Sequence, residues 1–211
     1  MTAGLALEGL RILQGETPLL ALDLTVPPGD VVSVMGESGA GKSTLLAAII
    51  GTLGPPFTMT GRVRLDGRDV TALPPERRGI GILFQDDLLF PHLSVGENLA
   101  FGLSRSVRGR AARRAAVEAA LAEMGLAGFA GRDPATLSGG QKLRVALMRT
   151  LLAEPRALLL DEPFSSLDAD RRAQVRALVF ARARERGLPV LMVTHDAADA
   201  EAAGGPVLRL G

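Results

Sequence analysis

Residues 36–44 read GESGAGKST and follow a short apolar run, residues 31–35. The letters match the phosphate-binding pattern G-x-x-x-x-G-K-[S/T], whose glycines let backbone N–H groups approach a phosphate. The apolar run 45–50 suits a helix, and the N-terminus of a helix favours an anion. This context predicts a phosphate loop rather than an ordinary glycine-rich turn. The candidate nucleotide-binding residues are Gly36, Glu37, Ser38, Gly39, Ala40, Gly41, Lys42, Ser43 and Thr44.

Two side chains of this loop have distinct roles in the pattern. Lys42 places a positive charge against the β- and γ-phosphates of a nucleoside triphosphate. The hydroxyl of Ser43 is a suitable ligand for Mg²⁺. The loop therefore predicts a nucleoside triphosphate bound together with Mg²⁺.

Composition narrows the class of protein. The chain has 211 residues, of which 47% are hydrophobic, and this is enough for a sizeable core within one unit. The net charge of +1 gives no overall attraction for nucleic acid, and we interpret the basic run 105–114 as a solvated helix face. The absence of cysteine excludes disulfides and thiolate metal sites. No apolar run approaches the ~20 residues that span a bilayer, so we expect another chain to hold this one at any membrane.

Strand-like and helix-like segments alternate along the chain. Apolar alternation predicts two antiparallel strands within residues 5–26, and buried or paired strands at 31–35, 62–66, 80–84, 157–160, 190–193 and 206–210. Helical periodicity and capping residues predict helices after Ser94 and at 110–124, 139–153 and 169–186. Pro55 and Pro56 are expected to end the helix region that follows the phosphate loop. Strands that alternate with helices favour an α/β fold with a mainly parallel sheet.

Polar residues follow three of the predicted strands. Asp161 and Glu162 close the run LLLDE at 158–162, His195 follows VLMVT, and Gln85 follows the strand at 80–84. Ligands of open α/β sheets bind at the carboxyl edge of the strands. There, one carboxylate could hold the Mg²⁺ shell while the other faces an attacking water. Taken singly, the acidic pair could instead be a solvated turn, and His195 an ordinary surface histidine.

A second helix start with small residues lies about 100 residues beyond the phosphate loop. It has bare N–H groups and could hold a second phosphate. One nucleotide needs only one such start, so two copies packed head-to-tail would bring one start of each copy onto the same nucleotide. The residues are Leu137, Ser138, Gly139, Gly140 and Gln141.

Together, GESGAGKST, Gln85, LSGGQ, LLLDE, SSLD at 165–168 and His195 resemble the nucleotide-binding subunit of ABC transporters. The motifs occur in the family's order across nearly the whole chain. The stretch 82–103 resembles bacterial binding-protein-dependent importers. The short overall length and the stretch DPATLSGGQ resemble most the compact importer ATPases of the thiamine, iron and sulfate group. The resemblance implies a P-loop NTPase (RecA-like) core with an antiparallel β subdomain and a helical insertion. We expect one domain over 1–211, with the β subdomain and core at about 1–86 and 154–211 and the helical subdomain at about 87–153.

The resemblance also implies a role for each motif. Asp161 would support the metal, Glu162 would polarise the attacking water, and His195 would hold the γ-phosphate. Gln85 would contact metal or water and link to the membrane partner. The LSGGQ residues would act in trans on the nucleotide of the other copy, and Asp168 would bridge the dimer.

Partners and location follow from the same resemblance. It implies ATP and Mg²⁺ as ligands, a homodimer, integral membrane permease subunits and, indirectly, a periplasmic or extracellular solute-binding protein. The chain would lie on the cytoplasmic face of the cell membrane, with segment 84–95 as the socket for the permease. The apolar members of that segment, Leu88, Leu89, Phe90 and Leu93, could alternatively be ordinary core.

One departure from the family concerns the base. Relatives stack the adenine on an aromatic residue near the end of the first strand, but this chain has neither Tyr nor Trp. We expect Leu13 to pack against the base instead, and GTP to compete better with ATP as a result. Two other functions stay open at this point: a cytosolic ABC ATPase of DNA repair or translation, and a nucleotide-bound regulator without turnover.

Overall fold

A computed structural model describes residues 3–86 and 88–210. Its first sheet is antiparallel with the strand order β2-β1-β4-β5. The predicted hairpin within residues 5–26 is confirmed, and β4 begins at Phe57, five residues earlier than expected. The strands are β1 (Leu5–Gln14), β2 (Thr17–Val26), β4 (Phe57–Leu65) and β5 (Arg68–Asp69).

The second sheet is parallel and has the order β6-β7-β8-β3-β9. The predicted α/β class is confirmed, including the weakly indicated last strand. Because all these strands run the same way, their carboxyl ends meet along one edge. The strands are β6 (Ile80–Leu83), β7 (Ala157–Asp161), β8 (Val190–Thr194), β3 (Val31–Met35) and β9 (Val207–Arg209).

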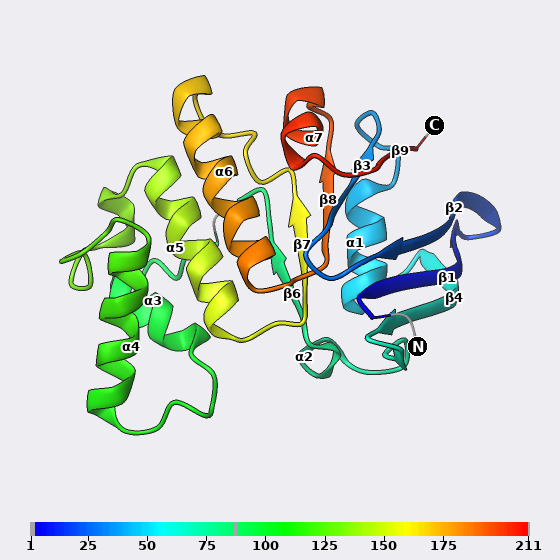
Figure 1. Cartoon of the computed structure of the whole chain (residues 1–211). Helices are drawn as coiled ribbons and strands as arrows, with labels where there is room; N and C mark the ends of the chain where they lie inside the picture. Colours follow the sequence, from blue (N-terminus) through cyan, green and yellow to red (C-terminus); the bar gives the residue numbers. More distant parts are fainter. Residues whose placement is uncertain (1–2, 87, 211) are drawn as a thin grey trace.

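Helices lie around the parallel sheet (Figure 1). They are α1 (Lys42–Ile50), α2 (Pro75–Arg78), α3 (Val95–Gly102), α4 (Arg110–Glu123), η1 (Pro134–Thr136), α5 (Gly139–Leu152), α6 (Ala169–Glu185) and α7 (Ala197–Ala203). The sequence patterns missed the short helices α2 and α7. Helix α1 ends at Ile50, before the two prolines expected to stop it, because Gly51 takes the left-handed conformation (φ 91°) that caps a helix.

The insertion between β6 and β7 is mostly helical. Helices α3, α4 and α5 lie together on one side of the parallel sheet, and the antiparallel sheet lies on the other side (Figure 1). Helix α3 begins as predicted, with a capping box in which Ser94 and Glu97 bind each other's backbone N–H groups. Asp87, within the expected helical segment, lies outside the described residues.

Strand alternation divides the buried apolar residues between two cores. On β7, Leu158 and Leu160 join the cluster under the helical insertion, whereas Ala157 and Leu159 join the cluster under α1 and the antiparallel sheet. This is the period-two pattern of a sheet buried on both faces. The two cores hold the parallel strands in place. Because these strands run in the same direction, the polar residues that follow them meet at one edge of the sheet. Over residues 3–86 and 88–210, no helix has the length and apolar character needed to cross a bilayer.

Candidate nucleotide site

The loop between β3 and α1 is closed by its own lysine. Lys42 Nζ donates to the carbonyl oxygens of Gly36 at 2.9 Å and Glu37 at 3.0 Å, and its side chain is only 7% exposed. Gly41, at φ 85°, is the N-cap of α1, and a Cβ there would lie 3.2 Å from Leu19. The left-handed turn and this close approach explain why glycine precedes the lysine.

The carboxylate of Glu162 lies between Lys42 and an imidazole that follows the neighbouring strand. Glu162 follows β7, and its Oε1 lies 3.4 Å from Lys42 Nζ. Its Oε2 lies 2.9 Å from Nδ1 of His195, which follows β8. Glu162 holds a positive φ of 43°, and its N–H donates to the Val193 carbonyl at 3.0 Å. A non-glycine residue in this conformation marks a position that the surrounding structure enforces, as is common at functional sites.

Ser43 and Asp161 face each other across the start of α1. The Ser43 hydroxyl donates to Asp161 Oδ1 at 3.4 Å. Burial raises the pKa of the Asp161 carboxyl, and the nearby charge of Glu162 adds to this, while the Ser43 hydrogen bond and Lys42 act in the opposite direction. A hydroxyl and a partly buried carboxylate at one place are the hard oxygen ligands that Mg²⁺ prefers.

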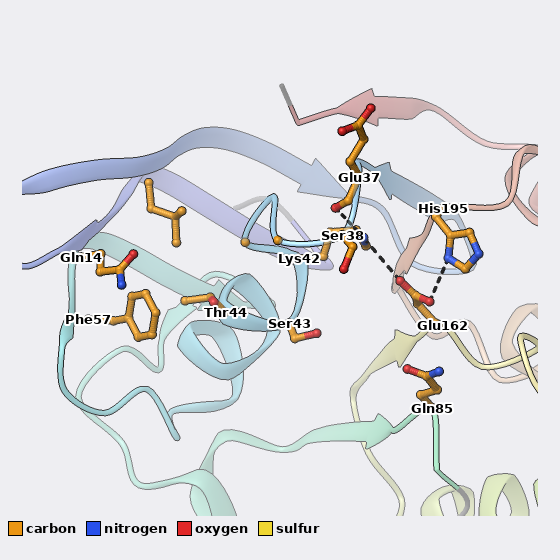
Figure 2. A pocket seen from close by; sticks show the side chains of 13 residues that line it. Gln14, Glu37, Ser38, Lys42, Ser43, Thr44, Phe57, Gln85, Glu162 and His195 are labelled. Carbon is orange, nitrogen blue, oxygen red and sulfur yellow. Dashed lines mark hydrogen bonds and ion pairs between the residues drawn. The ribbon is translucent and has the colours of Figure 1, made fainter.

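Lys42, Ser43, Glu162 and His195 line a cavity of about 670 Å³, a size typical of small-molecule sites, whereas Asp161 does not line it. Figure 2 shows the cavity with Glu162, His195 and Gln85 at one end and Gln14 and Phe57 at the other. Of the candidate phosphate-loop residues, Gly36 and Ala40 do not line it. The lining residues are Gln14, Leu19, Glu37, Ser38, Gly39, Gly41, Lys42, Ser43, Thr44, Phe57, Gln85, Glu162 and His195.

The far end of the cavity differs from expectation. Leu13 is absent from the lining, whereas Phe57 contributes to it from β4. In the sheet register, Phe57 pairs with Gln14, so a phenylalanine from a neighbouring strand lies beside the end of β1. The expectation that Leu13 forms this wall is therefore wrong. The sequence contained the signal, a phenylalanine followed by alternating Thr58 and Thr60, but the strand was expected to begin only at residue 62.

The LSGGQ stretch starts another helix and lies at a different cavity. Ser138 is the N-cap of α5: its Oγ accepts from the Gln141 N–H, and its own N–H donates to the Gln141 side chain. Ser138, Gly140 and Gln141 line a cavity of about 270 Å³ that shares no lining residue with the first. Leu137 is buried, and Gly139 is exposed. The structure thus does not bring this helix start onto the phosphate loop of its own chain.

Asp168, the candidate bridging residue, is the N-cap of α6. Its carboxylate accepts from the Arg171 N–H at 3.0 Å and lies 3.4 Å from the Arg171 Nε, with 57% of the side chain exposed. Helix α6 starts from this exposed position. The carboxylate therefore keeps solvent access although it caps a helix.

The segment after Gln85 is fixed by a buried asparagine. Asn98, on α3, has no exposed surface; it accepts from the Phe90 N–H at 2.8 Å and donates to the carbonyls of Phe90, Leu93 and Ser94. Between Gln85 and this clamp, Leu88 is 54% exposed, whereas Leu89 is half-buried and packs against the core. On α3, Phe101 is 71% exposed and forms an edge-on contact with Phe90.

A strand, a glycine loop closed by lysine, a helix start and a carboxylate at the edge of a parallel sheet define a phosphate-loop nucleotide-binding protein. Comparison with known proteins narrows this class. The model of the ABC transporter family matches residues 19–165. The chain is 49% identical over 199 residues to the uncharacterized ABC transporter ATP-binding protein YnjD of Escherichia coli K12, covering 94% of this chain and 91% of that protein.

Two relatives with named import functions extend the comparison. The thiamine import ATP-binding protein ThiQ of Rhizobium meliloti is 45% identical over 99% of this chain and 86% of its own length. The sulfate/thiosulfate import ATP-binding protein CysA of Mycobacterium bovis is 46% identical over 85% of this chain and 50% of its own length. The chain belongs to the ABC transporter family, as an ATP-binding ATPase.

Proposed function

We propose that this chain is the ATPase subunit of an importer, in which ATP-driven closure of two copies is coupled to solute movement through a separate permease. One observation carries the proposal: Lys42, Glu162 and His195, from three segments far apart in sequence, converge at one end of a cavity of about 670 Å³. The relatives named as thiamine and sulfate import ATP-binding proteins support the direction of transport.

Hydrolysis at this site needs a charge for the phosphates and a base for the water. Lys42 and the N–H groups of the loop bind the β- and γ-phosphates. Glu162 accepts the proton of the attacking water, and His195 orients Glu162 while contacting the γ-phosphate. Lys42 Nζ lies 3.4 Å and His195 Nδ1 lies 2.9 Å from the carboxylate of Glu162, and these distances support this division of roles. Gln85, at the same end of the cavity, orients the water or a metal ligand.

The oxygen ligands at the start of α1 fit Mg²⁺. Ser43 and Asp161 would hold the ion, with Gln85 nearby on the cavity wall. When bound, Mg²⁺ neutralises charge on the β- and γ-phosphates. Burial raises the pKa of Asp161 because it disfavours the charged carboxylate, and a bound cation would offset that cost.

A second copy of the chain completes the site. The two helix starts face separate cavities, so the LSGGQ start of one copy is free to meet the nucleotide of the other. Residues 137–141 would then bind the γ-phosphate in trans, and the exposed carboxylate of Asp168 would bridge the copies. Loss of the γ-phosphate removes these contacts, so the dimer opens after hydrolysis.

The membrane partner would dock beside Gln85. Phe84 and Leu88, which flank Gln85 in the chain, are exposed, and so is Phe101 on α3, which contacts Phe90 of the same segment; exposed apolar side chains of this kind can receive a partner helix. We place the chain on the cytoplasmic face of the membrane through this permease. A solute-binding protein outside would deliver the solute to the permease and act on this chain only indirectly.

The experiment that tests the proposal has two arms. Purified chain should hydrolyse Mg·ATP, and hydrolysis should fall by about 10²–10⁴-fold in the Glu162→Gln variant; the same rate in both would contradict the proposal. A permease encoded next to this chain should co-purify with it, and Phe101→Ser should reduce this co-purification while leaving ATPase activity intact. Capture that is equal in Phe101→Ser and wild type would exclude this surface.

A further inference from the structure

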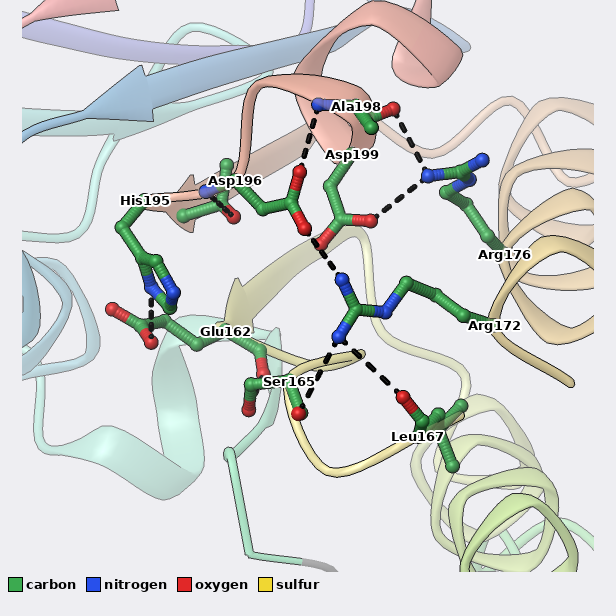
Figure 3. A network of polar contacts seen from close by, with 10 residues as sticks. Glu162, Ser165, Leu167, Arg172, Arg176, His195, Asp196, Ala198 and Asp199 are labelled. Atoms are coloured by element: carbon green, nitrogen blue, oxygen red, sulfur yellow. Dashed lines mark hydrogen bonds and ion pairs between the residues drawn. The ribbon is translucent and has the colours of Figure 1, made fainter. Parts of the chain in front are cut away.

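Arg172, near the start of α6, contacts two separate segments of the chain (Figure 3). Its Nη1 donates to Oδ2 of Asp196 at 2.5 Å. Its Nη2 donates two long hydrogen bonds, at 3.5 Å, to the carbonyl oxygens of Ser165 and Leu167. One planar guanidinium therefore joins the chain after β7 to the chain after β8.

Both segments also contact Glu162, one at its backbone carbonyl and the other at its carboxylate. The Ser165 hydroxyl donates to the Glu162 carbonyl at 2.9 Å, and His195, next to Asp196, lies 2.9 Å from Glu162 Oε2. These contacts, together with the peptide bond that joins His195 to Asp196, form a closed ring of residues. Its members, in order, are Glu162, Ser165, Arg172, Asp196 and His195.

A small cavity borders the ring on one side. It has a volume of about 90 Å³ and is lined by the five members together with Thr194 and Asp199. All the residues that line it are polar or charged, so on this side hydrogen bonds rather than apolar packing hold the side chains in position. Removing one bond of the ring should therefore let the others shift.

Asp196, one member of the ring, is anchored at the start of α7. Asp196 is the N-cap of α7: its Oδ1 accepts from the Ala198 N–H at 2.8 Å, and its own N–H donates to the Thr194 hydroxyl at 3.0 Å. Leu167, the other residue whose carbonyl Arg172 contacts, immediately precedes Asp168, whose side chain is exposed. A displacement of Asp168 therefore reaches the ring through the Leu167 carbonyl and Arg172.

We propose that Arg172 is a positioning residue that couples the Asp168 segment to the Glu162–His195 pair. The inference rests on the proposed function, in which Glu162 activates water and Asp168 meets the second copy. Contact between copies at Asp168 then sets the geometry of the general base, so that hydrolysis proceeds efficiently only when the dimer has closed. Nucleotide binding to a single copy does not pass through this arginine.

The geometry requires arginine at this position. A guanidinium presents several N–H donors in a fixed fork, so one side chain can bind a carboxylate and backbone carbonyls on different sides. Lysine would keep the charge and the pairing with Asp196, but its single ammonium has no second arm to reach Ser165 and Leu167. Arg172→Lys therefore keeps the positive charge beside Asp196 but removes the contacts with the Ser165 and Leu167 carbonyls.

The same helix offers a matched control one turn further on. Arg176 Nη1 donates to the Ala198 carbonyl and to Oδ1 of Asp199, both at 3.0 Å. These contacts tie α6 to α7, as those of Arg172 do, but they do not involve the Asp168 segment. Arg176→Lys therefore reports the loss of an ordinary arginine tie between the two helices.

The test compares Arg172→Lys with Arg176→Lys in the full chain. The measured quantities are the kcat for Mg·ATP, the Kd of a fluorescent ATP analogue, and ATP-driven dimerisation in the Glu162→Gln background. Small misplacements of a catalytic group cost up to about a hundredfold in rate, so Arg172→Lys should lower kcat by about tenfold to a hundredfold. Its Kd should stay within about twofold of wild type while the dimer weakens, and Arg176→Lys should behave as wild type.

Other outcomes are equally decisive. Equal losses of kcat in the two lysine variants, or a loss of analogue affinity in Arg172→Lys, would overturn the coupling. If Arg172→Lys does not fold, Asp196→Asn is the second variant, because asparagine keeps the acceptor for the Ala198 N–H but weakens the pairing with Arg172. A wild-type kcat in Asp196→Asn would also overturn the proposed coupling. If wild type shows no hydrolysis, or if Glu162→Gln does not dimerise, the proposed function itself fails, whereas failure confined to Arg172→Lys removes only the coupling.

Discussion

Glu162 Oε1 lies 3.4 Å from the Lys42 ammonium, so the residue proposed as general base is paired with the residue proposed to bind phosphate. Both side chains are largely buried, with exposures of 17% and 7%. A γ-phosphate entering the site would compete with Glu162 for this ammonium. Release of Glu162 from Lys42 would then free the carboxylate for a water, so that binding and activation become parts of one event.

Replacement of Glu162 should separate binding from hydrolysis. Glu162→Gln removes the base but keeps the shape, so hydrolysis of Mg·ATP should fall by about 10²–10⁴-fold, the usual contribution of a general base. ATP should be retained, and a stable dimer should be detected by sedimentation at saturating Mg·ATP. Glu201→Gln, at an exposed position on α7, is the control and should hydrolyse normally. A monomeric Glu162→Gln at saturating Mg·ATP would contradict the shared-site dimer.

Phe57 should hold the base. Its ring lines the far end of the cavity, and truncation of a stacking aromatic costs about 1–3 kcal/mol. Phe57→Ala should therefore weaken ATP binding about fivefold to 150-fold, as measured by equilibrium titration. Stacking is tolerant of base identity, so GTP should lose a similar factor.

Leu13→Ala is the matched control for the base wall, because Leu13 lies on the neighbouring strand but does not line the cavity. Its ATP affinity should equal that of wild type. If Leu13→Ala weakened ATP while Phe57→Ala did not, the assignment of the wall would be reversed.

Arg78 should stabilise the helix that follows the phosphate loop. Its guanidinium, on a residue only 6% exposed, donates to the carbonyls of Ala48 and Ile49 at the end of α1 and to those of Thr71 and Leu73. Burial lowers its pKa, although arginine remains charged.

Arg78→Ala leaves these carbonyls without a charged donor, so the free energy of unfolding should fall by about 1.5–3 kcal/mol in urea denaturation. Arg77→Ala, at the exposed neighbouring position, should change it little. Equal stability of the two variants would show that water replaces the guanidinium at no cost.

Asp66 should make the free energy of unfolding depend on pH. Burial raises the pKa of its carboxyl, but the hydrogen bond from the Gly4 N–H and the contact with Arg156 outweigh it, so the pKa is lowered overall. A lowered pKa stabilises the folded state above the ordinary value of about 3.9, and this contribution is lost as the pH falls through the folded pKa.

Asp66→Asn tests this term, because asparagine tolerates the positive φ of 50° at this position. The difference in unfolding free energy between wild type and Asp66→Asn should be largest at neutral pH and shrink in acid. A difference that stays constant from pH 7 to pH 3 would contradict the shift. Arg156→Gln should reduce the same difference, because Arg156 is one of its causes.

Local patterns predicted most of the fold because its elements have local causes. The phosphate loop, the capping box at Ser94 and the amphipathic helix at 110–124 each follow from residues close together in the chain. The helices α2 and α7 were missed because each is a short turn of helix, of four and seven residues, which periodicity cannot detect.

The candidate site divides in the same way. The edge of a parallel sheet gathers whatever follows its strands, so Glu162 and His195 could be placed together from the sequence alone. Phe57 and Arg172 could not, because their positions depend on strand register and on the packing of α6 against α7. Such relationships join distant segments and leave no periodic trace in the sequence.

The hydrogen bonds from Lys42 to the carbonyls of Gly36 and Glu37 have a practical consequence for mutagenesis. The ammonium both donates the hydrogen bonds that close the loop and supplies its positive charge. A substitution of Lys42 therefore removes the loop's hydrogen bonds and its cation together. Loss of binding in such a variant would say little about which of the two had mattered. A neutral replacement of Glu162 leaves the hydrogen bonds of Lys42 to the loop in place, so it is the more informative way to inactivate the enzyme.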